Sequence, residues 1–166
     1  MVFTAGEGQY AVDFSIDLTA QKEKVVFGDT KEGMFAIRVA QWLREKDGTG
    51  RYFSSEGDTG AKNIWGKRAR WVVLEGNKDG KEVGIAMLNY PPSTNYPTYW
   101  HVRDYGLFSA NPLGQQVFTK TRKVDNPKPF HLTLEPGESA HFNFKIVVYD
   151  GKKSANQIEK IFTGLK

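Results

Sequence analysis

The sequence predicts an all-β protein, an antiparallel β-sandwich with one short C-terminal helix. Three observations support this prediction. Apolar and polar residues alternate in several segments, which is the period of a strand with one buried face. Turns rich in Gly and Pro separate these segments at hairpin spacing. No helical segment lies between them to make a crossover, so we expect antiparallel neighbours in two sheets that pack face to face.

The N-terminal half contains most of the alternating segments. We expect strands at 10–18, 25–27, 34–40, 51–53, 65–75 and 83–90. The first of these alternates Tyr, Val, Phe, Ile and Leu with small or acidic residues, so one of its faces should be exposed to solvent. The polar, Gly-rich stretch 44–62 is expected to be a loop region around the short strand 51–53. Trp65 and Trp71 fall on the same face of the long strand and are expected in the core.

The C-terminal half begins with a Pro-rich segment, 91–97, which cannot join a sheet ladder and is expected to be a loop. Further strands are expected at 99–106, 116–120, 130–134 and 140–148, with a solvated basic turn at 120–123. Ser154 to Gln157 fits a capping box. The residues that follow it form an apolar stripe at helical spacing, made of Ile158, Ile161, Phe162 and Leu165. The chain is therefore expected to form one sandwich domain over 1–166.

Composition limits the function classes. The chain has 166 residues, 39% of them hydrophobic and 25% charged, with a formal net charge of +4. This mild charge gives no reason to expect a nucleic-acid partner, and no apolar run is long enough to predict a membrane span. The absence of Cys excludes disulfides and thiolate chemistry. No signal peptide is visible, so both cytoplasm and bacterial envelope fit, and nothing predicts an oligomeric state.

The segment 99–106 carries the main candidate for chemistry. Read as a strand, it places His101, Arg103 and Tyr105 on one face. An imidazole can act as general acid or base, a guanidinium can bind ligand oxygens, and a phenol can assist them. The alternative is an outer sheet face whose polar groups pair across strands. Asp104 points the other way and is expected to pair with Arg68 or Arg70.

Other residues suit a polar ligand without chemistry. Aromatic rings beside amides and guanidinium groups are typical of sugar sites, because a ring stacks on the C–H face of a pyranose. The candidate ligand-binding residues are Arg38, Asn63, Asn95, Tyr96 and Trp100. Pairing of Arg38 with a carboxylate, and a protein interface made by the loop aromatics, are the alternatives. His131 and His141 fall on outward faces, and we expect neither a metal site nor a cofactor.

Three segments resemble a bacterial family labelled methane oxygenase PmoA-like: 26–40, 63–72 and 100–114, in that order along the chain. This resemblance implies a β-sandwich connected with sugar catabolism, and the chain resembles the C-terminal half of a typical member. Members carry a histidine-rich N-terminal segment that this chain lacks. The phrases around 33–38 and 134–140 are also similar, more weakly, to galactose-mutarotase-like sandwiches, which implies a supersandwich.

The sequence leaves three functions open. The first is a soluble carbohydrate-active protein with His101, Arg103 and Tyr105 as catalytic groups and Arg38 as an oxygen ligand. The second is a carbohydrate-binding or protein-interaction module without chemistry, which uses Trp100, Tyr99 and Tyr96 as its platform. The third, ranked last, is the copper-dependent oxidation that the family label suggests.

Overall fold

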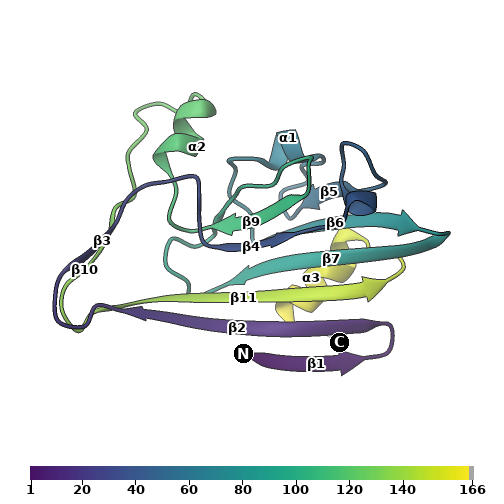
Figure 1. The fold of residues 1–166 in the computed structure, drawn as a ribbon, viewed down its shortest axis with the longest axis horizontal. Helices are drawn as coiled ribbons and strands as arrows, with labels where there is room; N and C mark the ends of the chain where they lie inside the picture. Colours follow the sequence, from purple (N-terminus) through teal and green to yellow (C-terminus); the bar gives the residue numbers. More distant parts are fainter. Residues whose placement is uncertain (165–166) are drawn as a thin grey trace.

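The computed structural model describes residues 1–164 and contains three antiparallel sheets (Figure 1). The largest has six strands in the order β1 (Val2–Gly6), β2 (Gln9–Thr19), β11 (Ser139–Asp150), β7 (Lys81–Tyr90), β6 (Trp71–Lys78) and β5 (Arg51–Ser54). The second has the order β4 (Phe35–Arg38), β9 (Leu107–Asn111) and β8 (Tyr99–Trp100). The third pairs β10 (Leu132–Leu134) with β3 (Val25–Phe27). The predicted all-β antiparallel sandwich is confirmed.

The main core lies between the six-stranded and the three-stranded sheet. Phe35 of β4 stacks on Phe144 of β11 at 4.4 Å between ring centroids, and Phe14 of β2 meets the same Phe35 edge-on at 4.8 Å. Phe108 and Trp100, from β9 and β8, are fully buried in this layer. Each of these strands presents alternate residues to the other sheet, so the alternation seen in the sequence corresponds to a physical interface.

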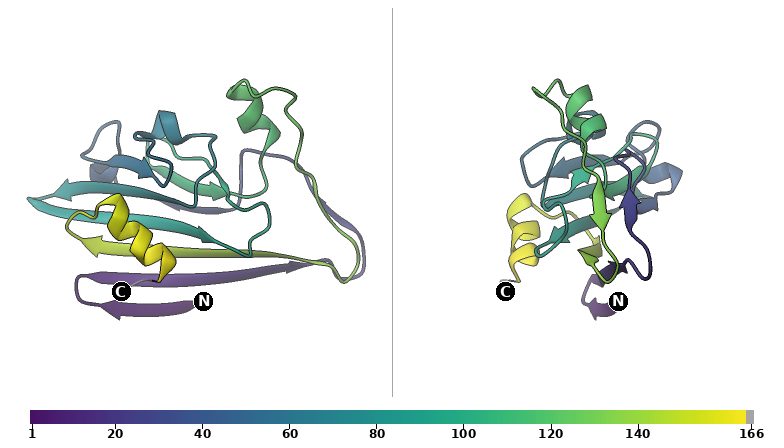
Figure 2. Two further views of the ribbon diagram at one scale, coloured as in Figure 1. Left: turned by 180° about the vertical axis from the view of Figure 1, so that it is seen from behind. Right: turned by 90° about the vertical axis from the view of Figure 1, so that its left-hand side faces the viewer.

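A second, smaller core lies on the opposite face of the large sheet, under α3 (Ala155–Thr163), as Figure 2 shows from behind. Ile158 of α3 is fully buried against this face, and Glu159 accepts hydrogen bonds from Trp71 Nε1 at 2.9 Å and from Arg70 at 2.6 Å. The predicted capping box is confirmed, since the Ser154 side chain accepts from the Gln157 amide and the Gln157 side chain accepts in return. Leu165, the last residue of the predicted stripe, lies outside the described residues.

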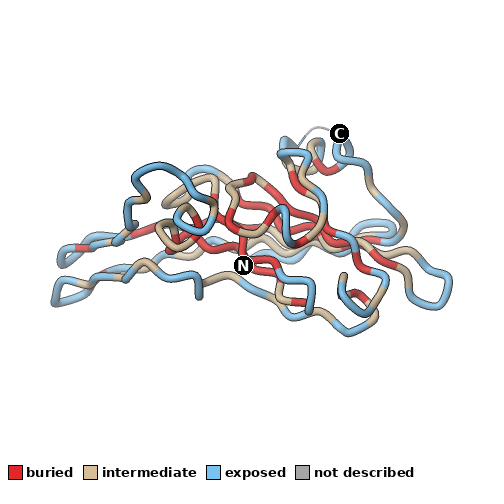
Figure 3. The backbone as a smooth tube through the Cα atoms, turned by 90° about the horizontal axis from the view of Figure 1, so that it is seen from above, coloured by how far each residue is buried: buried red, intermediate tan, exposed pale blue. Residues whose placement is uncertain are grey.

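The two faces of strand β11 are covered by different elements, the three-stranded sheet on one side and α3 on the other. Phe142 and Phe144 are buried toward the three-stranded sheet, whereas Val147 and Tyr149 are buried on the other face, under α3. Val148, which the alternation places in the core, is 44% exposed. Burial along the chain is strongest in the middle of the sheet and falls toward its ends, as the tube in Figure 3 shows. The predicted pattern was therefore right in period and wrong at this end of the strand.

Several expected elements differ from the structure. The long strand 65–75 begins only at Trp71, because 61–64 form the short helix α1 (Ala61–Ile64) and Gly66 has a positive φ of 72°. The expected strand 116–120 is a helix, α2 (Gln116–Thr121). The strands β1 and β9 and the 3-10 helix η1 (Gln41–Leu43) were not predicted. The basic turn 120–123 is only partly solvated, because Arg122 binds backbone carbonyls of the α1 segment.

The pair β3–β10 forms an arm that extends from one end of the sandwich (Figures 1 and 2). At its base the chain passes through Asp29 into the three-stranded sheet on one side and through α2 on the other. Over residues 1–164, none of the helices has the length and apolar character needed to cross a membrane.

Candidate functional site

The segment 99–106 is a strand for only two residues, but its backbone stays paired with β9. The amide of His101 donates to Ser109 O at 2.9 Å, and the amide of Arg103 donates to Leu107 O at 2.8 Å. A turn follows, closed by Gly106 N to Arg103 O at 3.0 Å. The expected alternation holds as far as Val102, which is fully buried in the main core together with Trp100. Asp104 is different, because it is exposed in the turn and does not lie inside the sandwich.

His101 is buried, with 3% of its surface exposed. Its Nδ1 lies 2.8 Å from Lys31 O, so the ring carries its hydrogen on Nδ1. Its ring packs edge-on against Trp65 at 6.0 Å and against Phe118 at 6.1 Å. Burial lowers the pKa of His101 below its usual value, and the nearby charges of Arg103 and Lys31 act in the same direction, against the raising effects of the Lys31 carbonyl and Glu32. The imidazole is therefore neutral at neutral pH.

This lowered pKa predicts a pH dependence of folding. Below the unfolded-state pKa, near 6.5, the unfolded chain takes up a proton that the folded chain resists. The free energy of unfolding should therefore fall as the pH drops below that value, with a contribution of at most about 1.4 kcal/mol per pH unit from this residue. Urea denaturation of wild type and His101→Gln between acidic and neutral pH measures it.

In His101→Gln the free energy of unfolding should depend less steeply on pH, by the contribution of this histidine. His131→Gln, which removes an exposed imidazole instead of the buried one, serves as the matched control. Identical slopes in wild type and His101→Gln would show that His101 takes up protons equally in both states.

Arg103 and Tyr105 lie together at the turn. The Arg103 guanidinium carbon lies 5.3 Å from the centre of the Tyr105 ring, and the Arg38 guanidinium carbon lies 5.4 Å from the same centre. Two cations thus share one phenol ring, and such contacts are worth about 0.5–1 kcal/mol when exposed. Tyr105 is 39% exposed. The three predicted catalytic residues therefore do not converge on one point: Arg103 and Tyr105 are adjacent on the surface, and His101 is buried against Trp65 and Phe118.

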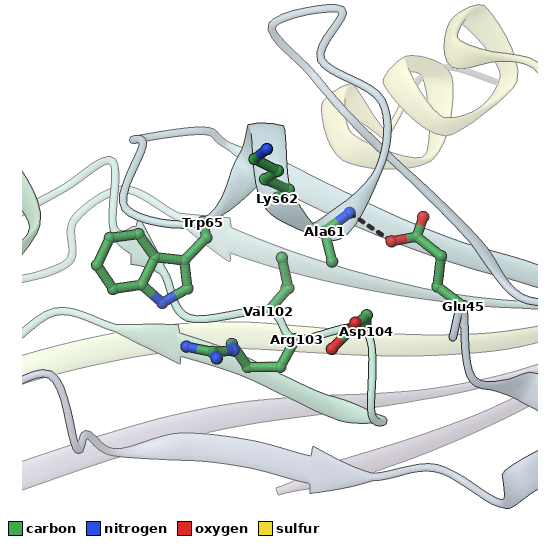
Figure 4. A pocket seen from close by; sticks show the side chains of 7 residues that line it. All are labelled: Glu45, Ala61, Lys62, Trp65, Val102, Arg103 and Asp104. Carbon is green, nitrogen blue, oxygen red and sulfur yellow. Dashed lines mark hydrogen bonds between the residues drawn. The ribbon is translucent and has the colours of Figure 1, made fainter. Parts of the chain in front are cut away.

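Arg103 lines a hollow of about 410 Å³, and His101, Tyr105 and Arg38 do not. The lining residues come from three separate segments: Glu45, Ala61, Lys62, Trp65, Val102, Arg103 and Asp104. Figure 4 shows Arg103 and the indole nitrogen of Trp65 toward one end and the carboxylates of Glu45 and Asp104 toward the other. Lys62 projects from α1 at the rim. The hollow therefore has a cationic end and an anionic end.

Backbone contacts hold the anionic end in place. Glu45 Oε2 accepts from the Ala61 amide at 2.8 Å, so this carboxylate ties the start of α1 to the chain that follows η1 (Figure 4). The carbonyl of Asp104 accepts from the amides of Glu45 and Lys46, both at 3.1 Å. These bonds join the 103–106 turn, the 45–46 segment and α1 into one frame. The Glu45 carboxylate and the backbone of Asp104 are therefore positioned before any ligand arrives.

Trp65 is held equally firmly at the other end. Its ring packs edge-on against Phe118 of α2 at 5.2 Å. Arg122 donates from Nε to Trp65 O at 2.8 Å and from Nη2 to the carbonyls of Lys62 and Asn63, both at 2.9 Å. One guanidinium thus satisfies the carbonyls at the end of α1, which would otherwise lack partners. The indole is a rigid wall of the hollow.

Several hydrogen-bond donors at the hollow have no side-chain partner within the described part of the chain. Trp65 Nε1 is buried and has no hydrogen-bond acceptor among residues 1–164. Within the same described part of the chain, neither Arg103 nor Lys62 forms a side-chain hydrogen bond or an ion pair. A buried N–H without an acceptor is costly, and native structures contain few. These donors are suited to the oxygens of a polar ligand.

The other predicted ligand-binding residues lie elsewhere. Trp100 is fully buried and donates from Nε1 to Ala69 O at 2.9 Å, so the prediction that it stacks on a ligand was wrong. Asn63 is exposed on α1 and donates to Thr59 O at 2.9 Å. Asn95 and Tyr96 lie in the Pro-rich loop, away from the lining of the hollow.

The Pro-rich loop is fixed by Arg68 rather than left free for a ligand. Arg68 donates to Asn95 Oδ1 at 2.6 Å and to the carbonyls of Asn95 and Pro97, and its guanidinium carbon lies 4.2 Å from the Tyr99 ring centre. Asn95 also donates to Pro112 O at 2.8 Å. Burial raises the pKa of Tyr96, against the charge of Arg70.

The expected pairing of Asp104 with Arg68 or Arg70 was wrong. Arg68 binds the loop, and Arg70 forms an ion pair with Glu159 at 2.6 Å. His131 and His141 are exposed, as expected, and His141 pairs with Asp17 on the neighbouring strand β2. Within residues 1–164, no three His, Asp or Glu side chains gather as they would around a metal ion.

Sequence reasoning missed four polar or aromatic residues of the hollow: Glu45, Lys62, Trp65 and Asp104. Glu45 and Lys62 lie in the stretch that was expected to be only a hairpin loop, and Trp65 was expected in the core. Gly66, directly after Trp65, was the available signal that the strand does not continue there.

The comparisons with known proteins give a family and no activity. Neither the curated proteins nor the solved structures contain a match to this chain. The comparisons therefore lend no support to the PmoA-like and mutarotase-like resemblances. One family model, that of a family of unknown function (DUF6807), matches residues 1–163, and the chain belongs to this family.

Proposed function

We propose that this protein binds a carbohydrate in the hollow between α1 and the 103–106 turn. The observation that carries the proposal is the meeting of four charged side chains, two acidic and two basic, around one rigid indole ring. A sugar offers an apolar C–H face for the ring and hydroxyl groups for carboxylates and cations. A volume of about 410 Å³ lies within the range of small-molecule sites and leaves room for a monosaccharide or a short oligosaccharide.

Binding is better supported than catalysis by His101. The imidazole is buried behind Trp65 and does not line the hollow, so it does not reach a ligand held there. The sugar connection implied by the PmoA-like resemblance agrees with this proposal. Copper-dependent oxidation does not, because the lining contains no imidazole, the nitrogen ligand typical of copper sites.

Isothermal titration calorimetry tests the proposal with a panel of neutral monosaccharides, disaccharides and uronic acids. Wild type should bind at least one member of the panel, and Trp65→Ala should weaken that binding by about tenfold or more, because truncating a central aromatic removes a large contact. Trp42→Ala is a matched control, since Trp42 is also a partly buried tryptophan but does not line the hollow.

Circular dichroism and thermal unfolding establish that both variants are folded at the titration temperature. The proposal fails if wild type binds nothing in the panel, or if Trp65→Ala and Trp42→Ala bind the ligand equally well.

A further inference from the structure

We infer that the preferred ligand is an acidic sugar, a pyranose that carries a carboxylate, and that Arg103 with the indole N–H of Trp65 receives this carboxylate. This inference rests on the proposed function and specifies its ligand. It follows from the separation of charge within the hollow, which a neutral sugar would not need.

The cationic end has the features of a carboxylate receptor. The guanidinium of Arg103 forms no ion pair within residues 1–164, although the hollow contains two carboxylates. It rests near Tyr105, at 5.3 Å between guanidinium carbon and ring centre, which restrains the side chain without occupying its N–H groups. A guanidinium presents paired donors that match the two oxygens of a carboxylate, and such charge-assisted bonds are stronger than neutral ones.

The indole N–H is a second donor at the same end. It lies in the wall of the hollow without an acceptor, and Figure 4 shows it on the side toward the Arg103 guanidinium. This nitrogen has almost no exposed surface, so a ligand oxygen reaches it only when a neighbouring side chain moves. Binding of a carboxylate would then satisfy a donor that the free protein leaves unpaired.

The anionic end suits the hydroxyl groups of the same ligand. Glu45 and Asp104 accept hydrogen bonds, and their backbones are joined by the bonds from Glu45 N and Lys46 N to Asp104 O. Ionised carboxylates are acceptors only, so they pair with hydroxyl donors and repel a second carboxylate. The ligand is therefore oriented in one direction, with its acid group toward Arg103 and its hydroxyl groups toward Glu45 and Asp104.

Paired titrations separate this inference from the proposed function. Calorimetry would compare glucose with glucuronic acid and galactose with galacturonic acid, each pair differing only at carbon 6. Wild type should bind the acid of at least one pair about tenfold or more tightly than its neutral partner. In Arg103→Gln this ratio should fall to about one, because the amide keeps hydrogen-bonding groups but carries no charge to pair with the carboxylate.

Two further variants assign the preference to particular atoms. Trp65→Phe keeps an aromatic ring but removes the N–H donor, so it should reduce the ratio of acid to neutral-sugar affinity. Arg38→Gln removes a guanidinium that also contacts Tyr105 but does not line the hollow, so it should keep the wild-type ratio.

The outcomes are distinguishable. Binding of neutral sugars with no preference for their acids overturns the inference and leaves the proposed function standing. A preference that survives in Arg103→Gln, or that is lost equally in Arg38→Gln, overturns the assignment to Arg103. An unchanged ratio in Trp65→Phe overturns the role of the indole N–H. Absence of binding to every probe, acids included, overturns both proposals.

Discussion

Replacement of Trp100 by Ala is expected to lower the free energy of unfolding by about 3–5 kcal/mol, the range typical of large aromatic side chains removed from a core. The indole is fully buried between the two sheets, and its ring lies 6.0 Å from that of Phe108. Its Nε1 also satisfies Ala69 O at 2.9 Å, so the variant gains both a cavity and an unpaired carbonyl. Urea denaturation followed by tryptophan fluorescence and far-UV circular dichroism measures the loss.

A pair of controls separates the cavity from the hydrogen bond. Trp100→Phe keeps most of the ring and loses the N–H, so its cost should be clearly smaller than that of Trp100→Ala. Tyr10→Ala removes an aromatic side chain that is 69% exposed, and its effect should stay within about 0.5 kcal/mol. If Trp100→Ala were no more destabilising than Tyr10→Ala, the placement of Trp100 in the core would be refuted.

The contrast between these two residues shows what alternation can predict. Tyr10 falls on the apolar face of its predicted strand and is exposed, whereas Trp100 was expected to contact a ligand and is buried. Period two identifies which residues share a face, but the extent of the covering layer decides which of them lose contact with water. The large sheet is longer than the layers that cover it, so its ends remain exposed although their pattern is that of a core strand.

The first part of the strand predicted over 65–75, residues 65–70, does not form, for a local reason. Alternation continues through it, but Gly66 adopts a positive φ and Arg122 holds the carbonyls of Lys62, Asn63 and Trp65 from a distant part of the chain. The helix α2 was missed for a similar reason, since its six residues are too few to show a helical period. Short elements stabilised by tertiary contacts leave little signal in the sequence.

The candidate site could be predicted only in part. Arg103 was identified because it lies beside other polar side chains within one short segment. Glu45 and Trp65 come from other segments and reach the same hollow only through the sheet pairing and through the bonds of Asp104 O. His101 and Trp100 were predicted to contact a ligand, but both are buried. The residue types in one short segment do not determine which of its side chains are buried. A site assembled from three segments requires the fold before its members can be identified.

Asp29 occupies a position at which three segments meet, at the base of the β3–β10 arm. Its Oδ2 accepts from the amides of Gln115 at 3.1 Å, Gln116 at 2.9 Å and Phe130 at 2.6 Å. One carboxylate thus binds the start of α2 and the chain that leads into β10. Hydrogen bonds from amides to a charged acceptor are worth more than neutral ones, at about 1.5–3 kcal/mol each.

Asp29→Ala is therefore expected to lower the free energy of unfolding by about 3 kcal/mol, less than the sum of three bonds because water reaches the partly exposed site. Hydrogen exchange should show the largest loss of protection in α2 and at Phe130, since the carboxylate joins these segments directly. Asp29→Asn keeps an acceptor without the charge, so its free energy of unfolding should lie between those of wild type and Asp29→Ala. Asp125→Ala, at an exposed position after α2, should match wild type. Uniform loss of protection across the sheets, with α2 no more affected than β6, would contradict a local role for Asp29.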